Sequence, residues 1–121
     1  MKGKLADVEF ELRDDVVFAR LAGEVDSSNV DELLTALTGA VPGGAQALVL
    51  HIGGVSYLDS AGVEMVFTLG DRLRHRRQRL GLVVPAGAPV ERVLEISSVS
   101  GATELAATEE DLLEMLGVDP G

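Results

Sequence analysis

The chain has 121 residues, of which 46% are hydrophobic and only 3% are aromatic. This length is typical of one domain with a self-sufficient core, here an aliphatic one, so we expect residues 1–121 to form a single domain. The net charge of −10 opposes direct binding to nucleic acid, and the absence of cysteine excludes disulfides and thiolate metal ligands. No apolar run reaches the length of a membrane span or a signal-peptide core, and we therefore expect a cytoplasmic location.

The start of the chain predicts a β-hairpin. Apolar and charged side chains alternate over 8–13, which indicates a strand with one buried face formed by Val8, Phe10 and Leu12. The pair Asp14-Asp15 supplies a turn. A second strand over 16–21 is expected to stop at Gly23, because glycine permits the unusual backbone angles with which a loop begins.

A helix and a buried strand are expected next. Residues 30–37 carry apolar side chains at helical spacing, and Ser28 with Asp31 forms an approximate capping box ahead of them. Gly39 is placed to end this helix. Residues 47–52 form an almost continuous apolar run, which is typical of a central strand covered on both faces.

The rest of the chain continues the alternation of helices and strands. Ser60 lies in the first turn of a helix whose apolar face is predicted to consist of Val63, Val66, Phe67, Gly70 and Leu73. A strand over 80–84 precedes a helix that Pro89 opens and that is buried through Val90, Val93, Leu94 and Ser97. A short strand over 103–105 leads to a last helix, capped by Thr108 with Asp111 and carrying the apolar residues Leu112, Met115 and Leu116.

The order of these elements is β-β-α-β-α-β-α-β-α, and it predicts the fold class. Strands that alternate with helices pair in parallel through crossover connections, whereas a hairpin pairs antiparallel. We therefore expect an α/β fold with a mixed, mostly parallel sheet of about five strands packed with four helices.

The tetrapeptide Asp59-Ser60-Ala61-Gly62 is the most informative segment for function. A hydroxyl in the first turn of a helix lies beside backbone N–H groups without partners, at the positive end of the helix dipole. A phosphoryl group on Ser60 is stabilised in such a place and adds negative charge, which weakens docking onto an acidic or apolar partner surface. The alternative is that Asp59 or Ser60 serves only as the helix cap.

Two motifs together resemble the STAS domain of the anti-sigma factor antagonists. The family has a strand, an aromatic or apolar pair, and then Asp-Ser-(Ser/Thr/Ala)-Gly-apolar, to which Tyr57-Leu58-Asp59-Ser60-Ala61-Gly62-Val63 is similar. Its second motif, Gly-x-apolar-Asp after the second strand, resembles Gly23-Glu24-Val25-Asp26. The resemblance covers nearly the whole chain and implies a single STAS-like domain.

The resemblance implies a switched binding module without catalysis or a cofactor of its own. Ser60 would be the phosphoacceptor, supported by Asp26, Asp59, Ala61 and Gly62. An anti-sigma factor serine kinase would bind the unphosphorylated form, release its sigma factor and, with its own ATP, phosphorylate Ser60; a serine phosphatase would reverse the step. The residues expected to contact this partner are Glu24, Ser27, Ser28, Asn29, Val63 and Glu64.

Other functions fit fewer of the residues. A STAS scaffold or accessory subunit of a signalling complex or membrane transporter would need no Ser60 switching, and gel filtration separates it from the monomer or weak dimer expected of a switch. A small-ligand sensor could use the same helix terminus. An enzyme is not expected, because Ser60 lacks a Gly-x-Ser-x-Gly elbow and the chain has no Walker sequence or recognisable zinc-ligand spacing.

Two further features allow more than one interpretation. His51 stands near the end of a strand where many STAS relatives carry Asp or Asn; it is either a hydrogen-bonded structural residue or a pH-sensitive neighbour of the switch. The basic run Arg72–Arg79 either complements the carboxyl end of a helix or docks an acidic protein or anionic lipid.

Overall fold

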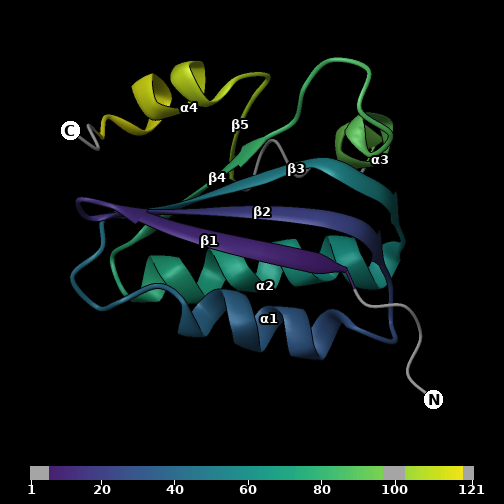
Figure 1. The fold of residues 1–121 in the computed structure, drawn as a ribbon, viewed down its shortest axis with the longest axis horizontal. Helices are drawn as coiled ribbons and strands as arrows, with labels where there is room; N and C mark the ends of the chain where they lie inside the picture. The colour runs from purple at the N-terminus through teal and green to yellow at the C-terminus, as the bar shows by residue number, and fades with distance from the viewer. Residues whose placement is uncertain (1–5, 97–102, 119–121) are drawn as a thin grey trace.

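A computed structural model describes residues 6–96 and 103–118 of the chain (Figure 1). Five strands form one sheet: β1 (Asp7–Arg13), β2 (Val16–Val25), β3 (Ala47–Leu58), β4 (Arg79–Val83) and β5 (Glu104–Ala106). The helices of the described ranges are α1 (Val30–Gly39), α2 (Ser60–His75), α3 (Glu91–Ile96) and α4 (Glu109–Leu116). The predicted element order and the predicted α/β fold class are confirmed.

The strands lie in the sheet in the order in which they occur in the chain. β1 and β2 form the antiparallel hairpin, and β2 to β5 pair in parallel. Because parallel strands point the same way, the carboxyl ends of β2 and β3 reach one edge of the sheet together, and this edge carries both sequence motifs. None of the helices in the described part of the chain is both long enough and apolar enough to cross a lipid bilayer.

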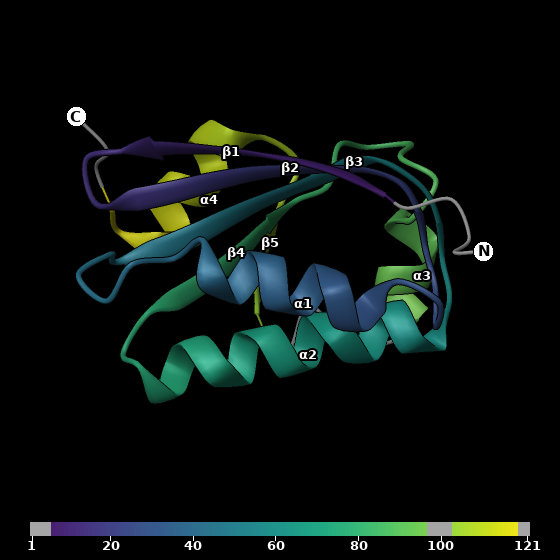
Figure 2. The ribbon, with the colours of Figure 1, turned by 60° about the horizontal axis from the view of Figure 1, so that its bottom comes forward.

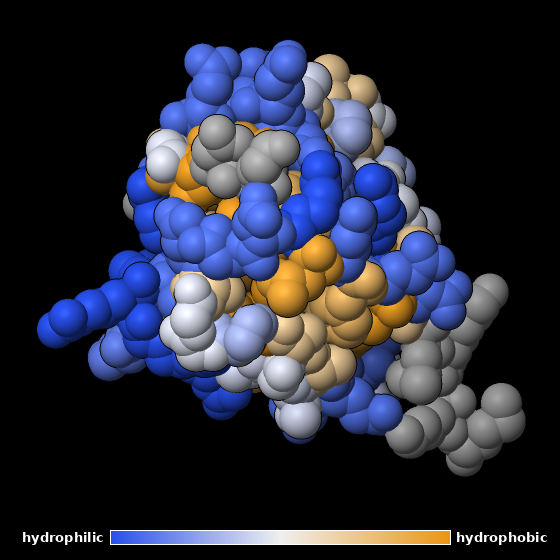
Figure 3. Space-filling model, turned by 60° about the vertical axis from the view of Figure 1, so that its left-hand side comes forward, coloured by the Kyte–Doolittle hydropathy of each residue, from blue (hydrophilic) through white to orange (hydrophobic). Residues whose placement is uncertain are grey.

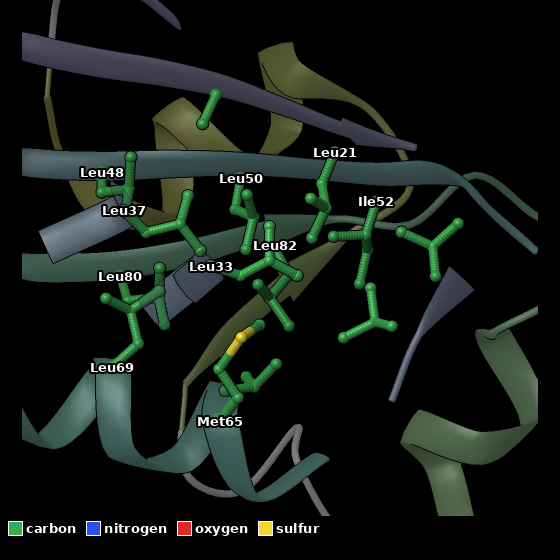
Figure 4. Close-up of a cluster of buried hydrophobic side chains, with 14 of the residues drawn as sticks. Leu21, Leu33, Leu37, Leu48, Leu50, Ile52, Met65, Leu69, Leu80 and Leu82 are labelled. Carbon is green, nitrogen blue, oxygen red and sulfur yellow. The ribbon is translucent and has the colours of Figure 1, made fainter. Parts of the chain in front are cut away.

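The sheet separates two clusters of buried aliphatic side chains. The larger cluster lies between the sheet and the helices α1 and α2, which run beneath it in Figure 2. Figure 4 shows its centre, where the leucines of β3 and β4 meet Leu33 and Leu37 of α1 and Met65 and Leu69 of α2. The smaller cluster lies on the opposite face, under Leu112 and Leu116 of α4. Burial on both faces explains the continuous apolar run of β3.

The apolar face predicted for β1 is not buried. Phe10 is 42% exposed and Leu12 is 58% exposed, and only Val8 packs against the larger cluster. The alternation correctly predicts a strand, but β1 is the outermost strand of the sheet. Periodicity does not reveal whether a helix covers the face that it defines.

Two strands run further than the sequence predicted. β2 continues through Gly23 to Val25, and β3 continues through Gly53 and Gly54 to Leu58. The glycines lie at irregularities of the β2–β3 register, and Gly23 has a φ of 101°, which strains any other residue. These glycines mark bulges and not strand ends.

Helix boundaries and faces also depart from the predictions. Asn29, and not Ser28, is the N-cap of α1, and its side chain makes no capping hydrogen bond. Pro89 precedes the first residue of α3, Glu91, by two positions, while Ser97 falls outside the described residues. Phe67 and Met115, assigned to apolar helix faces, are 37% and 47% exposed. The predicted cap of α4 is confirmed, because Thr108 accepts a hydrogen bond from the backbone N–H of Asp111.

A polar cluster fastens α4 to the sheet. The Glu109 carboxylate accepts a hydrogen bond from Arg13 of β1 at 2.9 Å and lies 2.7 Å from Nε2 of His51 in β3. Burial raises the pKa of Glu109, but the hydrogen bonds from Arg13 and His51 outweigh this effect, and the net result is a pKa below the usual 4.5. Nothing in the sequence pattern links these residues, which are up to 96 positions apart.

We expect Glu109→Gln to lower the free energy of unfolding by about 1 kcal/mol at pH 7, because the substitution removes charge from partly buried hydrogen bonds. A carboxyl whose pKa is lowered on folding stabilises the protein above its ordinary pKa and loses that effect as the pH falls through the folded value. Urea unfolding at several pH values should therefore show the variant and the wild type converging below pH 4.5. Glu110→Gln, at the exposed neighbouring position, is the matched control, and an equal loss there would contradict the anchoring role.

Candidate functional site

The two sequence motifs meet where β2 and β3 end. Val25 pairs with Leu58 in the last step of the parallel register, and the Asp59 backbone N–H donates to the Val25 carbonyl at 3.3 Å. Asp26 and Asp59 therefore follow neighbouring strand ends at the edge of the sheet from which α2 departs (Figure 1). Asp26 thus lies at the same end of the sheet as Ser60.

Asp59 and Ser60 have different tasks at the start of α2. Asp59 has the extended backbone of an N-cap, with φ −93° and ψ −172°, and its Oδ1 accepts a hydrogen bond from the Gly62 N–H at 3.0 Å. Ser60 is the first helical residue and is exposed, and its hydroxyl makes no hydrogen bond to any residue that the structure describes. Because Asp59 caps the helix, the Ser60 hydroxyl remains available for chemistry.

Gly62 permits α2 to start directly against the sheet. A Cβ atom at this position would overlap the Leu58 side chain and would lie 3.1 Å from a methyl group of Val25. Gly62 is buried, as are Val25 and Leu58 beneath it. The glycine of the Asp-Ser-Ala-Gly motif is therefore a packing requirement that fixes the height of Ser60 above the strand ends.

Asp26 organises its own loop. Its Oδ1 accepts hydrogen bonds from the backbone N–H of Ser28 at 2.9 Å and from the Ser28 hydroxyl at 2.5 Å. The hydroxyl bond is the larger cause of the lowered pKa of Asp26, and the backbone bond adds to it. The expectation that Asp26 positions the Ser60 hydroxyl is not met in this structure, because the carboxylate binds Ser28 instead.

Asn29 lies inside this loop and not on its surface. Its side chain is 1% exposed, accepts a hydrogen bond from the Asp26 N–H at 3.1 Å and donates one to the Glu24 carbonyl at 2.8 Å. Val63, which is 9% exposed, also points into the core. The predicted partner contacts of these two side chains are therefore corrected: Asn29 braces the loop, and Val63 anchors α2.

Of the other residues predicted to contact the partner, Glu24, Ser27, Ser28 and Glu64 are exposed. Ser60 itself does not line the hollow between α1 and α2, whose walls are Val30, Asp31, Leu34, Ala61, Glu64, Met65 and Thr68. An exposed hydroxyl on a helix start suits entry into the active site of another protein more than the enclosure of a small molecule. The described residues hold no group of three or more His, Asp or Glu side chains suited to a metal ion.

His51 and the basic run lie away from this edge. His51 contacts Glu109 on the face that α4 covers, which favours a structural role and not one beside the switch. In the basic run, Arg76 donates to the Val41 carbonyl and Arg79 donates to the Leu116 carbonyl, each at 2.7 Å. Arg76 thus holds the loop that follows α1, and Arg79 holds the carboxyl end of α4. Arg72 and Arg77 are exposed.

The STAS domain family model matches residues 7–112. This chain belongs to the STAS domain family. It is 30% identical over 97 residues to BtrV of Bordetella bronchiseptica, which is named as a candidate anti-sigma factor antagonist; the match covers 80% of this chain and 83% of BtrV.

Solved STAS structures share the fold of this domain. An anti-sigma factor antagonist from Mycobacterium paratuberculosis superposes with a TM-score of 0.81 at 22% identity, over 94% of this chain and 96% of the other. The anti-sigma factor antagonist SpoIIAA in its unphosphorylated form superposes with a TM-score of 0.69 at 23% identity, over 95% and 99% of the two chains. These likenesses establish the architecture of the domain.

Replacing Gly62 by alanine should destabilise this STAS domain by about 1–3 kcal/mol, because the added methyl group forces α2 away from Leu58. Gly70→Ala in the same helix is the matched control, since its Cβ would meet Leu80 at an ordinary 3.6 Å. We expect the control to be neutral or up to about 1 kcal/mol more stable, because alanine favours helix. Urea unfolding compares both variants with the wild type, and an equal response would contradict the packing argument.

The substitution Asn29→Ala should lower the stability of the STAS domain by about 2 kcal/mol, because it leaves the Asp26 N–H and the Glu24 carbonyl without their buried partner. Ser27→Ala, in the same loop but exposed, should change the stability by no more than about 0.5 kcal/mol. Thermal unfolding of both variants tests this difference. A neutral Asn29→Ala would return Asn29 to the set of candidate partner contacts.

Proposed function

We propose that this STAS domain is an anti-sigma factor antagonist whose binding to an anti-sigma factor serine kinase is switched by phosphorylation of Ser60. The observation that carries the proposal is the position of Ser60: an exposed first helical residue, freed from capping by Asp59 and held over the strand ends by Gly62. BtrV, SpoIIAA and the Mycobacterium paratuberculosis protein bear names of this functional class, and SpoIIAA has also been solved in a phosphorylated form.

The chemistry of the switch follows from charge. The first turn of α2 contains no acidic residue, so the amide groups at its start tolerate a phosphoryl group without loss of the helix. The dianion nevertheless lies close to Asp59 and Glu64 in the sequence. A partner surface that fits a neutral hydroxyl has no cation to pair with the dianion, so binding would require the desolvation of an unpaired charge. Phosphorylation is expected to end binding through repulsion and desolvation while the fold stays intact.

The proposed partner supplies what this domain lacks. The kinase brings ATP and its catalytic residues to Ser60, and the unphosphorylated antagonist keeps the kinase from its sigma factor. The exposed side chains of Glu24, Ser27, Ser28 and Glu64 border Ser60 in the proposed contact area. A serine phosphatase returns the domain to its binding form, and the domain acts in the cytoplasm together with these partners.

The first experiment is intact mass and peptide mapping of the protein from its native cells, in which we expect one phosphoryl group on Ser60. Ser60→Ala used as bait should retain the partner kinase in the presence of ATP, whereas the wild type should gain a phosphoryl group and dissociate. Ser60→Asp should weaken binding at least tenfold, which corresponds to about 1.4 kcal/mol.

Ser56→Ala is the matched control, because Ser56 is an exposed serine of β3 four positions away and should behave as the wild type does. Loss of all kinase binding by Ser60→Ala would contradict the switch. A chain that stays unmodified under every growth condition would favour the scaffold or transport-subunit function instead.

A further inference from the structure

The outer edge of β1 is an open, regular strand. β1 pairs with β2 from Asp7 opposite Ala22 to Arg13 opposite Val16 without a register shift, and it pairs with no other strand of the described ranges. The backbone N–H and C=O groups along its other side therefore have no sheet partner (Figure 1). Edge strands are usually protected by proline, a bulge or charged side chains. β1 has no proline and no bulge, so the charges of its alternate residues are what select among possible partner strands.

One side of β1 carries an apolar row, in which Phe10 and Leu12 are largely uncovered by the described residues. Val8, Phe10 and Leu12 lie opposite Leu21, Ala19 and Val17, whose side chains are buried in the cluster between the sheet and the helices α1 and α2. Phe10 and Leu12 nevertheless remain 42% and 58% exposed. Figure 3 brings forward the left-hand side of Figure 1, where the β1–β2 turn and α4 lie, and shows hydrophobic side chains among hydrophilic ones on this face.

The other side of β1 carries an acidic row of Asp7, Glu9 and Glu11, all of them exposed. The one cation of the strand, Arg13, is engaged elsewhere: it donates to Glu109 at 2.9 Å and lies 3.7 Å over the Phe18 ring, with Glu11 only at 3.8 Å. Asp7 and Glu9 form no ion pair within the described residues. Arg20 of β2 lies opposite Glu9 in the register and is exposed. Arg13 and Arg20 therefore offset the acidic row in part, and the three carboxylates leave it an excess of negative charge.

These two rows determine what fits the edge. A second copy of the chain would place its acidic row beside the first one, and like charges on neighbouring strands repel. A strand in which Lys or Arg alternates with apolar residues would pair its cations with Asp7, Glu9 and Glu11 and cover Phe10 and Leu12. We infer that β1 binds such an extended basic segment of another protein by β-strand addition.

The test uses the full chain labelled with ¹⁵N and two capped peptides of one composition. One peptide alternates, Lys-Val-Lys-Leu-Lys-Val-Lys, and the other is blocked, Lys-Lys-Lys-Lys-Val-Leu-Val. At physiological salt we expect the alternating peptide to bind at least tenfold more tightly, to shift the amide resonances of β1 and to slow amide hydrogen exchange there. Equal binding of the two peptides, or protection confined to other elements, would overturn the inference.

Variants separate β1 from the rest of the surface. Leu12→Ser should weaken binding of the alternating peptide at least fivefold, whereas Met115→Ser, at the exposed position of α4, should leave it unchanged. Glu9→Lys should weaken binding of the alternating Lys peptide and allow binding of the same peptide with Glu in place of Lys. A variant that is merely unfolded cannot exchange one preference for the other. Self-association through β1 at neutral pH would overturn the charge argument.

The inference does not depend on the Ser60 switch. β1 is expected to bind the alternating peptide equally in the wild type and in Ser60→Asp, because the strand edge is not part of the site at the start of α2. If the peptide binds β1 but the protein is never phosphorylated on Ser60, this inference holds and the proposed function is refuted.

Discussion

The close approach of α2 to the ends of β2 and β3 is the constraint on which the site depends. With only hydrogen at Gly62, the helix starts in contact with Leu58 and Val25, and Asp59 closes its first turn through the Gly62 N–H. The backbone of Ser60 is thus determined on both sides, by a capped helix and by a strand inside the sheet. The backbone therefore fixes the location of Ser60, although the Ser60 hydroxyl makes no hydrogen bond to the described residues.

The loop between β2 and α1 is held by hydrogen bonds among its own residues. Asn29 satisfies two backbone groups from a buried position, and Asp26 binds both the amide and the hydroxyl of Ser28. A loop whose polar groups are already paired internally has little to gain from rearranging. Under the proposed function, phosphorylation therefore acts through the added charge on a preformed surface, and not by refolding the loop.

The sequence predicted the elements well because their local patterns carry the information. Alternation in 8–13, helical spacing in 30–37 and the apolar run of 47–52 each identified an element, and two motifs after parallel strands identified their common edge. It could not predict that Asn29 is buried, that Phe10 is uncovered or that Glu109 binds Arg13 and His51. Those facts depend on which parts of the sheet the helices cover and on contacts between residues that are distant in the sequence.

The two faces of the sheet have different roles in this small domain. On one face, α1 and α2 bury the larger cluster and present the start of α2 at the sheet edge; on the other, α4 is fastened by Leu112, Leu116 and the Glu109 hydrogen bonds. Arg13 is shared between Glu109 at 2.9 Å and Glu11 at 3.8 Å, and the shorter contact is the one to α4. The contact that secures α4 thereby also reduces the positive charge that Arg13 offers to the acidic row of β1.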